Sequence, residues 1–83
     1  MIIHTPKHLA RYVSDQRKKL KMSQTSAGDL VGLKQKTLSA FENNPEGTRI
    51  ETLFRLLSAM NLEMHLIPKN ETIVKDHTER PEW

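Results

Sequence analysis

The sequence contains no cysteine among its 83 residues. Disulfide bonds and thiolate chemistry are therefore excluded, and the composition is compatible with a reducing compartment. Long apolar runs are also missing, since none approaches the roughly 20 residues that a membrane-spanning helix needs. The first residues, MIIHTPKHLARYV, contain no apolar stretch long enough for a signal peptide. These absences predict a soluble, cytoplasmic protein without a membrane partner.

The residue groups that enzymes use are equally scarce. The chain has no phosphate-cradling glycine loop and no plausible acid–base cluster. His4 and His8 are four residues apart, but His4 precedes the first expected helix and no further ligand has a matching spacing. We therefore expect no enzymatic activity, no cofactor and no metal site.

Charge divides the chain into two unlike halves. Residues 1–44 carry eight Lys or Arg and three acidic residues, whereas residues 45–83 carry five and seven. A basic half is typical of a protein that binds nucleic acid or an anionic membrane, although a solvated surface explains the charge equally well. Because the core of one small domain is marginal at this length, dimerisation would help to stabilise it.

Apolar periodicity and capping residues predict four helices. Thr5 and Pro6 open a helix that runs to about residue 21, and Ser23 caps a second helix near 24–31. Gly32 supplies a left-handed stop, after which a third helix covers about 34–43. A capping box over residues 48–51 opens a fourth helix that ends near residue 60. The fold is therefore expected to be mainly all-α, with four to five helices.

Residues 62–67 alternate apolar and polar side chains until Pro68, which predicts one short strand. A lone strand needs a pairing partner, and either Ile2-Ile3 or the same strand of a second chain would serve. The preceding helix is apolar over most of its surface, which indicates a face left over for a second copy. We predict that the homodimer interface contains Leu57, Met60, Leu62, Met64 and Leu66.

The middle of the chain fits a helix-turn-helix unit. Gly28 falls where the two helices approach most closely, and Gly32 falls in the turn, where a positive φ is needed. Because a glycine inside a helix costs about 1 kcal/mol relative to alanine, Gly28 indicates close helix packing. The positions where such a unit buries apolar side chains hold Ala27, Val31, Leu33, Leu38 and Phe41. The pattern favours a helix-turn-helix over an ordinary helical hairpin.

With Leu38 and Phe41 turned inward, the third helix has a polar outer face whose N-terminal part would enter the major groove of DNA. The residues predicted to contact bases are Lys34, Gln35, Lys36 and Ser39. The residues predicted to contact phosphates are Ser23, Gln24, Thr37, Asn43 and Asn44. Ser23 is equally explained as a helix cap, and the two asparagines as a turn, while Thr37 would also suit a thymine methyl.

Lys34 occupies the N-cap position of the third helix, where serine or threonine is expected. A cation there opposes the helix dipole and caps nothing, so the position is locally unfavourable. A phosphate or the edge of a guanine would compensate. We therefore predict that Lys34 contacts DNA, against the alternative of a solvated and mildly destabilising lysine.

Several short patterns resemble one family. The pattern KQ-x-T-x-S-x-FENNP from residue 34, the LxMxL strand and the terminal Glu82-Trp83 are similar to the HipB antitoxins, which have the Xre-type helix-turn-helix of phage repressors. The resemblance implies a phage-repressor-like homodimer whose C-terminal strands pair across the dimer. It also implies binding to an inverted repeat in double-stranded operator DNA, repression of the protein's own operon, and binding to a HipA-type Ser/Thr kinase toxin, single-chain or split.

The chain departs from this family at several positions. The family usually has Leu then Ala where this sequence has Ala27 and Gly28, and Lys36 and Ala40 lie on the reading face. These changes leave the operator sequence open, although not the mode of binding. Leu30 is an apolar residue expected to be exposed, where it either packs on a neighbour or meets the toxin.

Residues 69–83 form a separate tail after the helix-turn-helix domain at 1–68. Seven of the tail residues are charged, so we expect it to be disordered in the free protein. Trp83 is the only tryptophan and the last residue. It is either a chance exposed aromatic or an anchor that docks into a pocket of a partner, a role for which tryptophan is well suited.

Two other functions remain open from the sequence. A solitary phage-type repressor would share the DNA-binding mechanism but would need no toxin. A protein-binding adaptor would have no affinity for DNA. A kinase-like reading frame directly downstream of the gene would favour the antitoxin over both.

Overall fold

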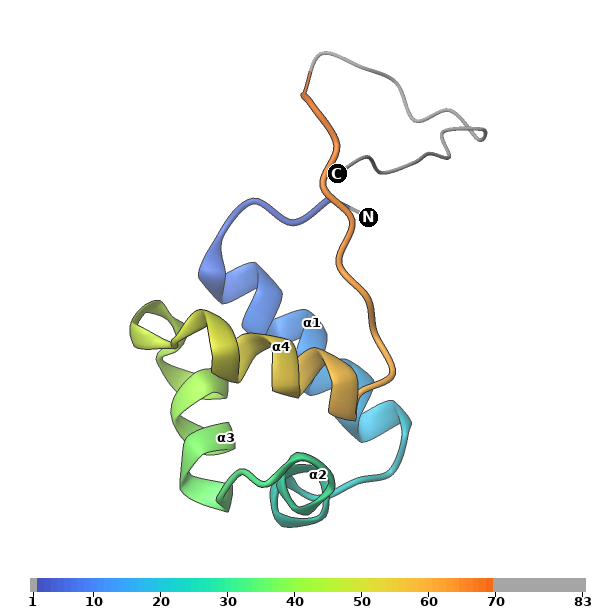
Figure 1. Ribbon diagram of the computed structural model, residues 1–83, viewed down its shortest axis with the longest axis vertical. Coiled ribbons are helices and arrows are strands. Elements are labelled where there is room, and N and C mark those ends of the chain that lie inside the picture. The colour runs from blue at the N-terminus through green and yellow to red at the C-terminus, as the bar shows by residue number, and fades with distance from the viewer. Residues whose placement is uncertain (1, 70–83) are drawn as a thin grey trace.

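The structure, a computed structural model, describes residues 2–69 of the chain. Within that range it contains α1 (Pro6–Lys19), α2 (Gln24–Val31), α3 (Gln35–Asn43), a short 3-10 helix η1 (Pro45–Gly47) and α4 (Ile50–Ala59). The helices lie close to the ranges expected from the sequence, so the prediction of a mainly helical fold is confirmed (Figure 1).

The first two helices begin at the residues that the sequence indicated, and α2 also ends there, whereas α1 ends at Lys19, two residues earlier than expected. The Thr5 hydroxyl accepts a hydrogen bond from the His8 backbone N–H at 3.0 Å, and Pro6 is the first residue of α1. Gly32 ends α2 with φ of 73°, the left-handed conformation expected of it. At the end of α1 the left-handed residue is Lys21, with φ of 60°.

The start of α4 differs from the prediction. The capping box over residues 48–51 is not formed, because Arg49 is the N-cap residue and no side chain caps this helix. Thr48 closes the preceding 3-10 turn instead, where its backbone N–H donates to the Pro45 carbonyl at 3.0 Å. The helix therefore starts too late for the Thr48 side chain to cap it.

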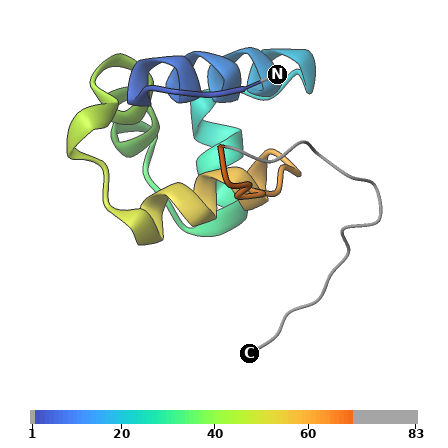
Figure 2. The same cartoon turned by 90° about the horizontal axis from the view of Figure 1, so that it is seen from above.

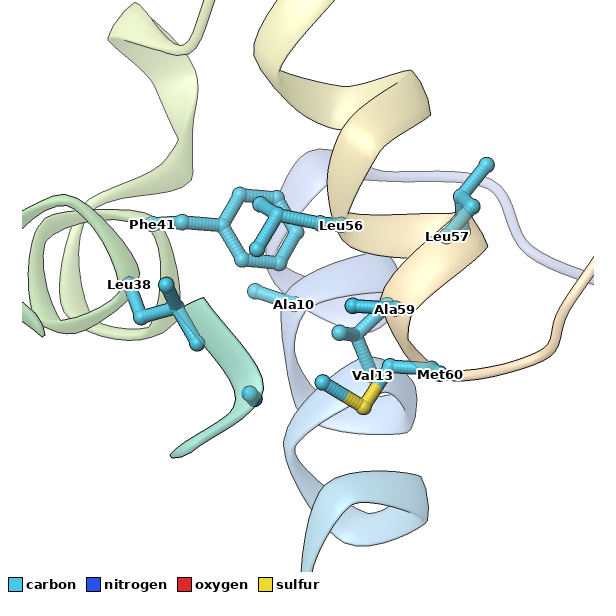
Figure 3. Packing of buried hydrophobic residues seen from close by; sticks show 9 residues of the cluster. Ala10, Val13, Leu38, Phe41, Leu56, Leu57, Ala59 and Met60 are labelled. Carbon is cyan, nitrogen blue, oxygen red and sulfur yellow. The ribbon is translucent and has the colours of Figure 1, made fainter. Parts of the chain in front are cut away.

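The four α-helices surround one small core. Helix α3 packs against α1 and α2, and α2 also packs against α4. Figure 2 shows α1 along one side of the molecule and α4 along the other. The buried apolar side chains shown in Figure 3 come from all four helices and include Ala10, Val13, Leu38, Phe41, Leu56 and Met60. Both inward residues expected on α3 are thus in the core.

Two residues that the sequence assigned to the dimer interface lie in this core instead. The exposed fraction is 0% for Met60 and 7% for Leu57, so both side chains pack mainly within the protein's own core. Most of α4 is apolar, and the pattern alone did not show which part faces the protein's own core. The apolar side chains that α4 leaves exposed are Ile50 and Phe54.

The segment after α4 leads away from the helices without forming a strand in this single chain. Leu62 is half-buried, whereas Met64 and Leu66 are exposed. Residues 62–68 carry no regular secondary structure, so pairing with Ile2-Ile3 is wrong within the described range. Pairing with a second chain stays a prediction. The tail, with Trp83, lies outside the described residues apart from Lys69.

Candidate nucleic-acid interface

The junction between α2 and α3 holds the two helices at a fixed angle. The Gly28 carbonyl oxygen accepts a hydrogen bond from the Leu33 backbone N–H at 2.9 Å, which closes the turn after α2. A Cβ atom on Gly28 would collide with the Leu33 carbonyl oxygen and crowd the Leu38 side chain. The close approach predicted at this glycine is therefore confirmed, and the turn is a helix-turn-helix.

Ser23 holds the start of α2 through a reciprocal pair of hydrogen bonds. The Ser23 hydroxyl accepts from the Ser26 backbone N–H, and the Ser26 hydroxyl accepts from the Ser23 backbone N–H, both at 2.9 Å. This capping box satisfies two backbone donors and fixes the first turn. The structure thus assigns Ser23 a capping role, and a phosphate contact by the same residue stays a prediction.

Burial of two side chains determines which face of α3 is free. Leu38 is 1% exposed and Phe41 is 3% exposed, so the opposite face of the helix points away from the core. On the free side, the exposed residues are Lys34, Gln35, Lys36 and Ala40, and the half-buried residues are Thr37 and Ser39. Four of these six side chains can donate hydrogen bonds close to the N-terminus of the helix, and a fifth, Ser39, one turn later.

Lys34 is the N-cap residue of α3, as predicted. Its backbone is extended, with φ of −83° and ψ of 155°, and its side chain makes no capping hydrogen bond. Its carbonyl oxygen accepts from the Thr37 backbone N–H at 2.9 Å. Lys34 therefore adds a positive charge near the positive end of the helix dipole, and an anion or a hydrogen-bond acceptor from a partner would offset this unfavourable arrangement.

The asparagines after α3 have different surroundings. The Asn43 side-chain amide donates to the Ser39 carbonyl at 2.9 Å and to the Ser39 hydroxyl at 3.3 Å. Asn44 is exposed and is the C-cap residue. Asn43 is thus folded back along its own helix, which favours the structural explanation for it, while Asn44 remains open to a phosphate.

A chain of hydrogen bonds joins the interior to the predicted reading face. Arg17 donates to Glu42 through Nε at 2.8 Å and through Nη2 at 3.1 Å. Gln24 donates its amide to Glu42 at 3.0 Å, and the Gln35 amide donates to the Gln24 side-chain oxygen at 2.7 Å. Residues of α1, α2 and α3 therefore form one continuous network that ends at an exposed residue.

The ion pair at the centre of this network is largely buried. The Arg17 and Glu42 side chains are 10% and 11% exposed. Burial raises the pKa of Glu42, but hydrogen bonds from Arg17 and Gln24 and the charge of Arg17 lower it by more, so it ends below its usual value. The hydrogen bond to Glu42 raises the pKa of Arg17. Both groups are therefore charged near neutral pH.

Sequence reasoning missed this ion pair. It gave neither Arg17 nor Glu42 a role. A usable signal was present, since Arg17 is four residues after the buried Val13 and Glu42 is four residues after the buried Leu38. Opposite charges on the inward faces of two packed helices indicate a buried pair.

Exposed lysines precede α2 and lie at the start of α3. Lys18, Lys19 and Lys21 are exposed at the end of α1, and Lys34 and Lys36 are exposed at the start of α3. The ion pairs found between described residues involve none of these lysines.

The described range contains neither a cluster of metal-ligating side chains nor a membrane-spanning helix. Residues 2–69 contain no group of three His, Cys, Asp or Glu side chains placed to hold a metal ion. None of the helices in that range is both long and apolar enough to cross a membrane.

Comparison with known proteins agrees with this geometry. The Helix-turn-helix family model matches residues 6–67. The Escherichia coli (strain K12) protein Antitoxin HipB is 33% identical over 82 residues, which cover 98% of this chain and 93% of that protein. This chain belongs to the HipB family of helix-turn-helix antitoxins. HipB of Escherichia coli O6:H1 is 36% identical over 64 residues, or 77% of this chain and 68% of that HipB.

Solved HipB structures also share the fold. A complex described as "HipB-O4 20mer complex" matches with a TM-score of 0.79 and 34% identity, covering 82% of this chain and 96% of that one. A second, described as "Structure of HipA-HipB-O2-O3 complex", matches with a TM-score of 0.80 at the same identity and coverage. The helical part of the fold is therefore that of HipB.

Proposed function

We propose that this chain is an antitoxin that acts as a homodimeric repressor. It binds an inverted-repeat operator in double-stranded DNA, represses its own operon and binds a HipA-type Ser/Thr kinase toxin. The observation that carries the proposal is the free face of α3, which presents Lys34, Gln35 and Lys36 as exposed donors beside the start of α2. The relatives described above as complexes with a 20mer and with HipA support the same reading.

In this proposal α3 enters the major groove with its N-terminal residues foremost. Lys34 donates to a guanine edge or a phosphate, and Gln35 forms a bidentate pair with adenine. Lys36 and Ser39 lie on the same side and complete the set of base contacts. Exposed lysines near the end of α1 add attraction to the phosphates without sequence preference.

Phosphate contacts then fix the register of α3. They come from Ser23, Gln24, Thr37 and Asn44 in this proposal, since Asn43 is bonded back to Ser39. Gln24 keeps one amide hydrogen beyond the one it gives to Glu42. Such contacts position the protein but carry no base information.

The second copy covers the apolar surface beside α4. A groove there is lined by Phe54, Leu57, Ser58, Asn61, Leu62, Glu63 and Met64. Met64 is 43% exposed and Leu66 is 87% exposed, although both are large and apolar. Pairing of residues 62–67 between two chains would bury these side chains and satisfy the backbone of the segment. A two-fold dimer explains why the operator is an inverted repeat.

The first experiment measures DNA binding by fluorescence anisotropy. The probe is a duplex from upstream of the gene that carries an inverted repeat, with half-sites about 34 Å apart or a multiple of it. Lys34→Ala and Gln35→Ala are expected to relax the base preference at particular positions, by about 1–3 kcal/mol for each lost bidentate contact. Lys7→Ala, which changes an exposed lysine in the first turn of α1, is the matched control.

The outcomes separate the alternatives. If Lys34→Ala and Gln35→Ala weaken binding equally for every sequence, both residues contact phosphates and not bases. Tight binding to a single half-site, with no gain from the repeat, would contradict the dimeric mode. No binding to any duplex would favour the protein-binding adaptor.

The second experiment tests the toxin. A HipA-type kinase encoded beside the gene is expected to co-purify with the chain, and kinase activity is expected to fall in the complex. We propose Trp83 and the 65%-exposed Leu30 as toxin contacts. Deletion of Trp83 is expected to weaken toxin binding and leave operator binding unchanged. A gene with no kinase neighbour, and a protein that represses without one, would favour the solitary repressor.

A further inference from the structure

We infer that Glu42 determines which base Gln35 selects, although Glu42 itself lies too deep to touch DNA. The two residues are linked only through Gln24, by hydrogen bonds of 3.0 Å and 2.7 Å. The inference rests on the proposed function, because it concerns how the same helix reads an operator. It adds a positioning residue to that function and a physical reason why Gln35 would prefer adenine.

The argument begins with the fixed position of Glu42. Its carboxylate accepts from Arg17 Nε at 2.8 Å, from Arg17 Nη2 at 3.1 Å and from the Ser14 hydroxyl at 3.4 Å. Arg17 is itself held from the other side, because its Nη1 donates to the Met22 carbonyl at 2.8 Å. The carboxylate is thus held by three hydrogen bonds from α1, and the neighbouring guanidinium favours its charged form.

An ionised carboxylate can accept hydrogen bonds but cannot donate them. Gln24 must therefore turn its NH₂ group toward Glu42, which leaves its side-chain oxygen facing away from Glu42 and toward Gln35. That oxygen can also only accept, so Gln35 must in turn present its own NH₂ group to Gln24. The charge of Glu42 thereby fixes the orientation of two amides, one after the other.

This orientation determines what Gln35 offers to a base. One Nε2 hydrogen is used by Gln24, and the second hydrogen and Oε1 make no hydrogen bond to any other residue of the 2–69 range. Adenine presents an N6 donor beside an N7 acceptor, which is the complement of that pair. Guanine presents two acceptors, O6 and N7, so its O6 would face Gln35 Oε1 as acceptor against acceptor. The fixed amide therefore favours adenine over guanine.

The variant Glu42→Gln tests this. A glutamine at this position can turn either its oxygen or its nitrogen toward Gln24, so the polarity of the two amides is no longer imposed. Lower stability of the variant would not imitate the effect, because both duplexes compete for the same folded protein. The readout is the ratio of two dissociation constants, for duplexes that differ only by adenine or guanine at one position. That position is first located as the one whose preference Gln35→Ala abolishes.

We expect wild type to prefer adenine there by about tenfold or more, as a bidentate contact allows, and Glu42→Gln to lower that ratio, because the Gln35 amide then has to be oriented when it binds. Gln24→Ala, which leaves the Arg17–Glu42 pair intact, should reduce the ratio in the same way. Ser14→Ala is the matched control, because Ser14 also bonds Glu42 but lies off the path to Gln35. Its ratio should equal that of wild type.

Two results would overturn the inference. One is a Glu42→Gln protein that binds both duplexes more weakly with an unchanged ratio, which would make Glu42 purely structural. The other is a wild-type preference for guanine at the Gln35 position. Failure of the proposed function looks different, since wild type would then bind no duplex sequence-specifically and the ratio at every position would be one.

Discussion

The α2–α3 junction and the surface beside α4 differ in the kind of side chain they hold and in whether those side chains have partners. At the junction, polar groups from three helices bond one another, from Arg17 in the interior to Gln35 at the surface. Beside α4, large apolar side chains stay exposed, with Phe54 at 56% and Ile50 at 68%. The polar groups at the junction thus find hydrogen-bond partners within one chain, whereas the apolar side chains beside α4 have no covering partner among the described residues.

This difference shows how one small domain can be prepared for two kinds of partner. A polar surface that meets DNA has to have its donors in place beforehand, because each misplaced amide would face a base with the wrong group. An apolar surface needs only shape and area, since burial of apolar groups has no direction. At the junction, the buried charges of Arg17 and Glu42 therefore orient the amides that would face DNA. Beside α4, apolar side chains stay exposed instead.

The largest expected effect comes from breaking the junction at its charged centre. Arg17→Ala leaves the Glu42 carboxylate buried without its partner and removes the bond to the Met22 carbonyl. The free energy of unfolding should fall by about 3–5 kcal/mol, as measured by urea denaturation.

The control for this variant is Arg55→Ala. Arg55 and Glu51 form an ion pair of 3.2 Å whose side chains are 46% and 70% exposed, so its loss should change stability by less than about 1 kcal/mol. Equal losses in the two variants would mean that burial of the Arg17–Glu42 pair has no consequence.

A smaller effect is expected from filling the closest contact of the junction. Gly28→Ala gains helix propensity, but its methyl group would collide with the Leu33 carbonyl oxygen. Because backbone must move to relieve that contact, we expect a net loss of about 1–3 kcal/mol in thermal or urea unfolding. Gly47→Ala is the control, since a Cβ there would meet no atom within 4 Å. A Gly28→Ala protein more stable than wild type would contradict the geometry of the turn.

Acid should lower the free energy of unfolding, because the folded protein lowers the pKa of Glu42. Since that pKa is lower in the folded protein than in the unfolded chain, the unfolded chain binds more protons in the acid range. The Glu42 contribution to stability is present above the unfolded value, about 4.3, and is lost as pH falls through the folded value. Urea unfolding between about pH 6 and pH 3 should show a shallower decline for Glu42→Gln than for wild type. An identical decline would mean that Glu42 does not titrate with folding.

The smallest effect on the fold is expected on the apolar side. Phe54→Lys changes an exposed residue, so the stability of the isolated chain should change by only about 0.5 kcal/mol. Self-association, measured by sedimentation equilibrium, should nevertheless be lost. Thr25→Lys adds the same charge on an exposed position of α2 and should leave association unchanged. A Phe54→Lys dimer as tight as wild type would place the interface elsewhere.

Prediction from the sequence succeeded at positions where the local backbone conformation requires a particular type of residue. Gly32 was identified because a left-handed turn favours glycine, and Ser23 because a hydroxyl can cap a helix. It failed at Leu57 and Met60, which were assigned to a partner and are core residues. Both residues satisfy the same apolar pattern in either role, so periodicity could not separate the two.

The sequence by itself determined the four helices, the turn between α2 and α3, and the outward placement of Lys34 and Gln35, because these follow from local conformation and from the spacing of apolar residues. Only the tertiary structure decided that Arg17, Gln24 and Glu42, which belong to three different helices, meet behind Gln35. Contacts between residues distant in sequence depend on how the helices pack, and no local pattern records them. The orientation of the Gln35 amide is therefore a property of the folded domain, although the amide itself is visible in the sequence.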